Sequence, residues 1–251
     1  MASTSSTLPA GGPWLRVLIV GAALVTVTFG IRQVFGLFVV PMSMALDSGV
    51  QMIALAIAVQ NLVWGFSSPF FGALADRIGA WKVAMVGAAI YTGGLLSSAL
   101  IVSPGGVFLG QALIGLGLGS AGISIALGAV GRVVPPERRS IAFGLVTSFG
   151  SFGQFALLPV TQMLISDQGW QMTLLMLSFL TAAMMAMALG MRTAPQARTS
   201  DIAELSTADA LRVAVRSRDY ILLTAGFFVC GLQLVFITTH LPVFLFDNGV
   251  D

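Results

Sequence analysis

One arginine lies inside a long apolar run of the chain, where a charged side chain is costly unless it has a partner or a ligand. Arg32 falls within the run from about 15 to 41. It is about nine residues from the end of that run, or roughly 14 Å at 1.5 Å per residue, which is too deep for the charge to reach polar surroundings easily. Its guanidinium is always charged, and its planar fork matches a carboxylate with two hydrogen bonds. We therefore expect Arg32 to hold an organic anion; a structural ion pair or carbonyl clamp, and a role in an outer gate, are the alternatives.

Further polar side chains fall at similar depths in other apolar runs. They are Gln60, Asn61, Tyr91, Ser120, Ser124, Gln154 and Gln233. We expect the four amide side chains among them to form one substrate-binding site together with Arg32. His240 lies seven positions after Gln233, and therefore on the same face of a helix. Its imidazole could couple a proton near neutral pH, while a neutral histidine that joins two helices is the alternative.

These residues must be positioned by helices that cross a bilayer. The chain is 57% hydrophobic and 9% charged, with a mean hydropathy of +0.95, whereas a soluble domain carries about 25% charged residues. A spanning helix needs roughly 17 to 25 apolar residues. The runs of this length cover about 15–41, 50–71, 82–102, 106–131, 141–165, 171–191 and 219–246. We therefore predict an all-α integral membrane protein with seven spans.

The charged residues between the runs predict which side of the membrane each segment faces. Eleven of the twelve Lys and Arg residues fall in segments on one side, counted across the runs, and Arg32 is the twelfth. The breaks at 47–49, 103–106 and 167–169 contain no Lys or Arg. Because basic loops mark the cytoplasmic face, we expect a multi-pass protein of the inner (plasma) membrane with a cytoplasmic N-terminus.

The runs group into two parts. We expect a cytoplasmic tail over 1–14, a six-helix bundle over 15–191, a cytoplasmic linker over 192–218 and the first helix of a second bundle over 219–251. A shift of 201 positions brings four identities between 30–41 and 231–242, and it places Arg32 on Gln233. Internal repeats of this kind relate the halves of many membrane proteins. Since the rest of a second bundle is missing, we expect the chain to be truncated at its C-terminal end.

Two patterns typical of other protein classes have simpler explanations here. The segment 117–122 fits G-x-G-x-x-G, yet it lies within an apolar run and lacks the strand and the acidic residue of a dinucleotide site. Ser120 and His240 could be imagined as a protease dyad, yet Ser120 has no G-x-S-x-G frame. The basic residues are spread along short loops, which argues against nucleic acid as a partner. The sequence predicts no enzyme and no metal, nucleotide or organic cofactor.

A charged turn joins the second and third runs. It reads Gly72-Ala-Leu-Ala-Asp76-Arg77-Ile-Gly79-Ala-Trp-Lys82. This turn resembles the signature loop of the major facilitator superfamily, G-x-L-x-D-R-x-G-x-[KR]-[KR], with Trp81 in place of one basic residue. The resemblance covers essentially the whole chain and implies the N-terminal six-helix bundle of that fold plus the first helix of the second bundle. It also implies a cytoplasmic gate made of Gly72, Asp76, Arg77, Gly79 and Lys82, in which Asp76 and Arg77 latch one bundle against the other.

Other stretches resemble particular branches of this superfamily. The segments 32–38 and 137–144 look like those of monocarboxylate and oxalate/formate porters, and in monocarboxylate porters a basic residue occupies the place of Arg32. Gln111 stands where many proton-coupled members carry Arg, and the fifth run lacks the G-P-x-x-G-G pattern of drug/proton antiporters. The resemblance implies secondary active transport by alternating access, with a small organic anion such as a monocarboxylate, the lipid bilayer and a coupling proton as partners. The alternatives are an exporter of drug-like compounds and a truncated, non-transporting product or membrane scaffold that needs a partner bundle.

Overall fold

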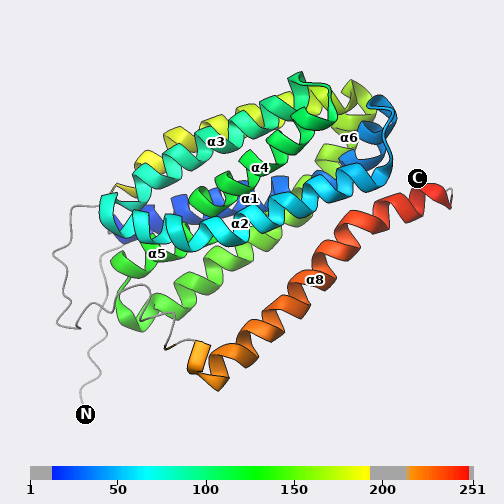
Figure 1. Cartoon of the computed structure of the whole chain (residues 1–251). Coiled ribbons are helices and arrows are strands. Elements are labelled where there is room, and N and C mark those ends of the chain that lie inside the picture. The colour runs from blue at the N-terminus through cyan, green and yellow to red at the C-terminus, as the bar shows by residue number, and fades with distance from the viewer. Residues whose placement is uncertain (1–12, 193–212, 214, 249–251) are drawn as a thin grey trace, which may run out of the picture. The chain divides into compact units, whose positions relative to one another are not determined.

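The computed structural model describes residues 13–192, 213 and 215–248, and its regular elements are all helices (Figure 1). The chain divides into two compact units, one ending at Arg192 and the other beginning at Thr193. The first unit contains α1 (Pro13–Ala45), α2 (Val50–Ile78), α3 (Ala80–Leu100), α4 (Pro104–Ala121), α5 (Ile123–Val133), η1 (Pro136–Arg138), α6 (Arg139–Ala188) and η2 (Leu189–Met191). The second unit contains α8 (Arg218–Asp247). The tail predicted over 1–14 and the linker predicted over 192–218 lie mostly outside the described residues.

Six of the described helical stretches are long and apolar enough to cross a membrane. This confirms the predicted all-α membrane fold, although seven runs were expected. The difference comes from α6, whose 50 residues would measure about 75 Å if straight, whereas the hydrocarbon core is about 30 Å thick. Gly169 breaks α6 with φ 79° and ψ 164°, a backbone conformation that favours glycine. Figure 1 shows α6 running out in green and returning in yellow, so it contains both predicted spans.

The predicted fourth span, over 106–131, consists of two helices. Gly122 has φ −84° and ψ −160°, so α4 ends before it and α5 begins after it. The Gly122 N–H still donates to the Leu118 carbonyl at 2.9 Å. The two helices together form one candidate span over Pro104–Val133. The break therefore divides this span into two helices without ending it.

Close backbone approach holds the helices of the first unit together. The two halves of α6 pack on different neighbours: Thr26 of α1 donates from Oγ1 to the Phe149 carbonyl at 3.0 Å, and Thr92 of α3 pairs with Thr181 at 2.9 Å. A Cβ at Gly153 would lie 2.2 Å from the Thr26 carbonyl oxygen. Small residues at such crossings let membrane helices meet at short distance. The packing explains why α1, which carries Arg32, is fixed on the first half of α6.

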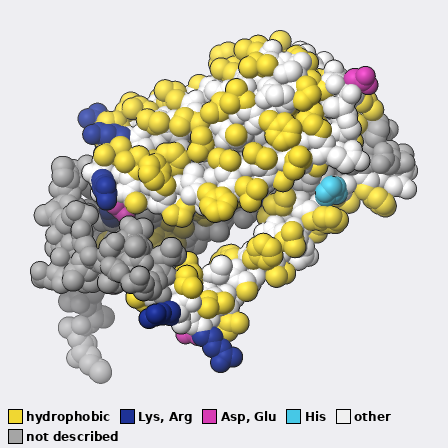
Figure 2. Space-filling model, in the orientation of Figure 1, with side chains coloured by type: hydrophobic (Ala, Val, Ile, Leu, Met, Phe, Trp, Pro, Cys, Tyr) yellow, Lys and Arg dark blue, Asp and Glu magenta, His cyan; other side chains and the backbone are white. Residues whose placement is uncertain are grey.

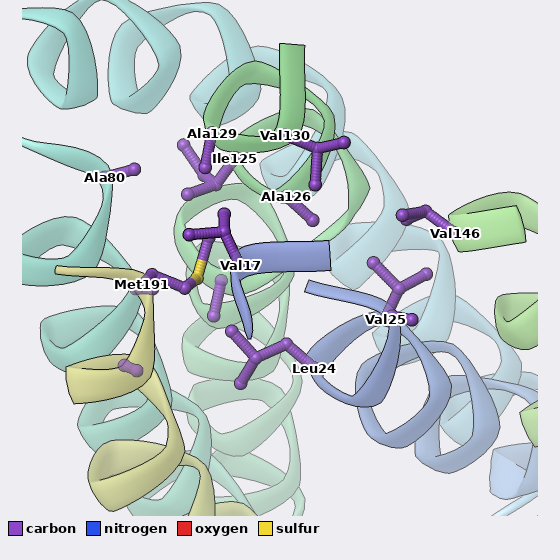
Figure 3. Packing of buried hydrophobic residues seen from close by; sticks show 14 of the residues in the cluster. Val17, Leu24, Val25, Ala80, Ile125, Ala126, Ala129, Val130, Val146 and Met191 are labelled. Carbon is purple, nitrogen blue, oxygen red and sulfur yellow. The ribbon is translucent and has the colours of Figure 1, made fainter. Parts of the chain in front are cut away.

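A cluster of buried aliphatic side chains fills one end of the first unit. Figure 3 shows side chains from different parts of the chain meeting there, and the labelled ones are Val17, Leu24, Val25, Ala80, Ile125, Ala126, Ala129, Val130, Val146 and Met191. They come from α1, α3, α5, α6 and η2. The polar side chains of α1 and α2 that the sequence singled out, Arg32, Gln60 and Asn61, are not members of this cluster.

The basic residues of the first unit other than Arg32 gather at one of its ends. Its basic residues apart from Arg32 are Arg16, Arg77, Lys82, Arg132, Arg138, Arg139 and Arg192, and all lie near helix ends on the side where α2 meets α3. Figure 2 shows dark blue side chains toward that end and a magenta one at the opposite end. Asp47 and Asp167 flank the turns of the opposite side. This is the distribution that the sequence predicted for the bundle.

Candidate functional site

The Arg32 side chain extends from α1 to α2. Its Nη2 donates a hydrogen bond to Asn61 Oδ1 at 2.9 Å. Its Cζ lies 4.9 Å from the centroid of the Trp64 ring, so the guanidinium covers one face of the indole. Asn61 and Trp64 are three residues apart on α2 and therefore share one face of that helix. The structure thus brings together two residues that the sequence predicted, Arg32 and Asn61, and adds Trp64.

Both α2 side chains are themselves held in place. Asn61 Nδ2 donates to the Ile57 carbonyl at 2.8 Å, which leaves Oδ1 directed at Arg32. The Trp64 ring meets Phe29 edge to face, with centroids 5.9 Å apart and planes at 79°. Phe29 precedes Arg32 by three residues on α1, so the same face of α1 supplies both the cation and the ring that supports its aromatic neighbour.

Several polar atoms around this region are shielded and unpaired. Among the described residues, Arg32 Nε has no hydrogen-bond partner. The amide groups of Gln60 and Gln111 also lack partners there, although Gln60 is only 1% exposed and Gln111 is fully buried. Buried polar groups are normally satisfied by protein or by water. Each of these atoms therefore lacks the partner that a buried polar group normally has.

Tyr91 closes the α3 side of the region. Its side chain is fully buried, and its hydroxyl donates to the Thr28 carbonyl at 3.2 Å. Thr28 lies one turn before Arg32 on α1. A Cβ at Gly117 would lie 2.6 Å from Tyr91 Cβ, so α4 approaches the ring closely. Tyr91 thus ties α3 to α1 beside the cation.

The remaining predicted substrate residues lie elsewhere. Gln154 is half-buried on α6, next to the glycine that meets α1, and among the described hydrogen bonds neither it nor Gln60 is joined to Arg32. Gln233 and His240 are exposed on α8 and belong to the second unit. The His240 ring contacts Phe236 with centroids 4.9 Å apart and the two planes tilted at 42°. The predicted five-residue site therefore remains a prediction, of which the structure joins Arg32 and Asn61.

The signature turn forms a small charged cluster at the basic end of the first unit. Asp76 Oδ1 pairs with Arg132 Nη1 at the end of α5, at 2.5 Å. Arg77 is exposed and forms no ion pair among the described residues. Gly79 has φ 99°, a value that favours glycine, and it joins α2 to α3 in one step. Sequence reasoning missed Arg132, because it lies 56 positions from Asp76 and no local spacing relates the two.

The N-terminal end of α3 carries a second cluster beside this turn. The Trp81 ring lies 4.8 Å from Arg192 Cζ and 5.6 Å from Lys82 Nζ. Arg16 Nη2 donates to the Arg192 carbonyl at 2.8 Å. Trp81, which interrupts the expected basic pair, thus joins the start of α3 to the end of the first unit. Among the described residues, no group of three His, Cys, Asp or Glu side chains could hold a metal.

Comparison with known proteins relates this architecture to transporters. The family model described as Major Facilitator Superfamily matches residues 18–251. Monocarboxylate transporter 13 of Rattus norvegicus is 26% identical over 181 residues, covering 72% of this chain and 42% of its own length. Monocarboxylate transporter 11 of Homo sapiens is 31% identical over 179 residues, covering 69% and 37%. The uncharacterized MFS-type transporter YcxA of Bacillus subtilis is 26% identical over 227 residues, covering 88% and 55%. The chain thus spans 55% or less of the length of these relatives.

Solved structures support the fold. A peptide transporter in complex with alafosfalin matches with a TM-score of 0.61 at 18% identity, covering 89% of this chain and 46% of its own. The POT family transporter PepTSo matches with a TM-score of 0.58 at 16% identity, covering 90% and 51%. At these identities the likeness concerns the fold alone. With the family model matching nearly the whole sequence, the chain belongs to the Major Facilitator Superfamily, a family of multi-pass membrane transporters.

Proposed function

We propose that this chain is part of a secondary active transporter for small organic anions such as monocarboxylates, and that Arg32 binds the carboxylate. The observation behind this proposal is the uncompensated charge of Arg32. Its described contacts, Asn61 and Trp64, are both neutral. The acidic side chains that the structure describes are Asp47, Asp76, Glu137, Asp167 and Asp219, and each lies near a helix end or a turn. A cation inside a membrane span needs a counter-charge, which a transported anion would supply.

Two further observations favour an anion over a neutral or cationic cargo. Several similar proteins are named monocarboxylate transporters. In addition, the acidic side chains that the structure describes lie near helix ends or turns, so none of them would attract a cationic, drug-like compound to the depth of Arg32. Gln60, Gln154 and Gln233 are proposed to line the same substrate path, and His240 to couple a proton.

The proposed mechanism is alternating access, in which two bundles rock around a central site. The signature turn would govern closure of the basic end: Gly72, Gly79 and Lys82 shape it, while Asp76 and Arg77 make and break contacts. The partner that the structure gives Asp76 is Arg132, within the same unit. We place the protein in the inner (plasma) membrane with its N-terminus in the cytoplasm, because the basic end of the first unit fits the cytoplasmic face.

Uptake of labelled L-lactate tests this proposal. The protein should be purified at the length it has in its native membrane and reconstituted in liposomes. A hydrogen bond to a charged group is worth about 1.5–3 kcal/mol, so Arg32→Gln should weaken the apparent lactate affinity by roughly 10- to 100-fold. Arg138→Gln is the matched control. Arg138 is exposed at the basic end, so this variant should leave uptake unchanged. Unchanged affinity and rate in Arg32→Gln would refute the proposal.

A further inference from the structure

We infer that Asn61 and Trp64 are positioning residues that present the Arg32 guanidinium to the substrate, rather than substrate contacts themselves. This inference rests on the proposed function, since it assigns roles within the same anion site. It also changes the role expected for Asn61, which the sequence placed among the residues that bind the substrate.

The hydrogen bonds of Asn61 support a positioning role. Its Oδ1 accepts from Arg32 Nη2 at 2.9 Å, and its Nδ2 donates to the Ile57 carbonyl at 2.8 Å. Both ends of the amide are therefore engaged within the protein. The bond to Ile57 also fixes which way the amide faces, since a rotated amide would turn its NH₂ group toward a cation. Asn61 thus orients the guanidinium and has little left to offer a ligand.

Trp64 restricts the direction from which an anion can reach Arg32. Its ring lies against the guanidinium at 4.9 Å and is supported by Phe29. A ring face attracts the cation and leaves no space for a carboxylate on that side. The ligand therefore has to approach at the edge of the guanidinium, where the N–H groups point.

The unpaired donors identify the edge of the guanidinium that has no protein partner. An arginine has five N–H donors, and among the described residues the Arg32 side chain makes a single hydrogen bond, to Asn61. Arg32 Nε is shielded from solvent and has no partner. A carboxylate placed on the donors that Asn61 leaves free, Nε among them, would satisfy a buried polar group and neutralise a buried charge together. Because guanidinium and carboxylate groups are both planar, such a carboxylate would lie in the plane of the fork.

Exchanging the amide for a carboxylate separates this role from a merely structural one. In Asn61→Asp the new carboxylate would pair with Arg32 and occupy it, so the variant should keep its thermal stability and lose lactate affinity by roughly 10- to 100-fold. In Asn61→Leu both hydrogen bonds disappear, so stability should fall, while Arg32 keeps its charge and affinity should fall less than in Asn61→Asp. A structural role predicts the opposite order, because the aspartate is the milder change for the fold.

The experiment measures L-lactate binding by calorimetry, together with thermal unfolding, on the purified protein. Asn248→Asp is the matched control: Asn248 also donates from Nδ2 to the carbonyl four residues earlier, at 2.7 Å, but it is exposed. That variant should bind lactate like the unaltered protein. Trp64→Phe should weaken binding by a few fold, because phenylalanine is a poorer partner for a cation than tryptophan.

The experiment separates a failure of the positioning roles from a failure of the proposed function. If the unaltered protein does not bind lactate, or if Arg32→Gln binds it equally well, the proposed function and this inference both fail. If Arg32→Gln abolishes binding while Asn61→Asp and Trp64→Phe leave it unchanged, only the positioning roles are overturned. An affinity lower in Asn61→Asp than in Asn61→Leu, with the stabilities in the opposite order, supports the inference.

Discussion

The ion pair between Asp76 and Arg132 should stabilise the conformation of the basic end of the bundle only weakly. It should not hold that end in a single conformation. The two side chains are 62% and 41% exposed, respectively. At 4 Å, two unit charges interact by about 1 kcal/mol in water and about 4 kcal/mol at an effective dielectric of 20. Measured couplings of exposed pairs are about 0.2–1 kcal/mol, because solvent screens the charges and ordering the side chains costs entropy. We therefore expect a coupling of at most about 1 kcal/mol, or roughly fivefold in an equilibrium constant.

A double-mutant cycle with Asp76→Asn and Arg132→Gln measures this coupling. Urea unfolding of the protein in detergent, followed by tryptophan fluorescence, gives the free energy of unfolding for each variant. The coupling should decrease further as salt rises above about 0.15 M, where the screening length is near 8 Å. A cycle of Asp76→Asn with Arg138→Gln is the control and should show no coupling. A salt-independent coupling above about 2 kcal/mol would refute the reasoning, because it would require a desolvated pair.

Further predictions concern packing and buried polar groups. Gly153→Ala should lower the stability by about 1–3 kcal/mol, because its Cβ would meet the Thr26 carbonyl. Gly144→Ala on the same helix is the control and should be neutral, because a Cβ there meets nothing within 4 Å. Equal effects of the two substitutions would contradict the close contact between α1 and α6 at Gly153. Gln111→Leu should leave stability unchanged or raise it, since its buried amide has no described partner and removal of an unsatisfied group is favourable; a clear loss of stability would reveal a bound partner. Tyr91→Phe should cost about 0.6 kcal/mol, the average for hydrogen bonds between membrane helices, and a loss above about 2 kcal/mol would contradict the single bond to α1.

The helices of this protein could be predicted largely from composition. Run length and the polar breaks predicted the turn at Gly169, and the structure places a non-helical glycine there. The break at Gly122 could not be predicted, because the flanking residues contain no proline or charge, and serines such as Ser120 and Ser124 are also common packing residues in membrane helices. A glycine in an apolar helix serves equally well as a packing residue or as a break, so the sequence leaves its role open.

The candidate site was predictable in part. Arg32 stands out because a lone charge in an apolar run is rare, and an amide at the depth of Asn61 is the kind of partner it needs. Trp64 gave no such signal, since an aromatic residue in a membrane helix more often faces lipid or other helices. The link between Asp76 and Arg132 depends on the way α5 returns to the end of α2. Such a contact follows from tertiary packing, which residue spacing along the chain does not encode.

A structure of the protein with L-lactate bound tests the central claim most directly. The account predicts a carboxylate oxygen within about 3 Å of an Arg32 nitrogen, with Nε among the donors, and with Asn61 and Trp64 still on the other sides of the guanidinium. Lactate bound away from Arg32, or Arg32 paired with an acidic side chain in the lactate-bound protein, would contradict it.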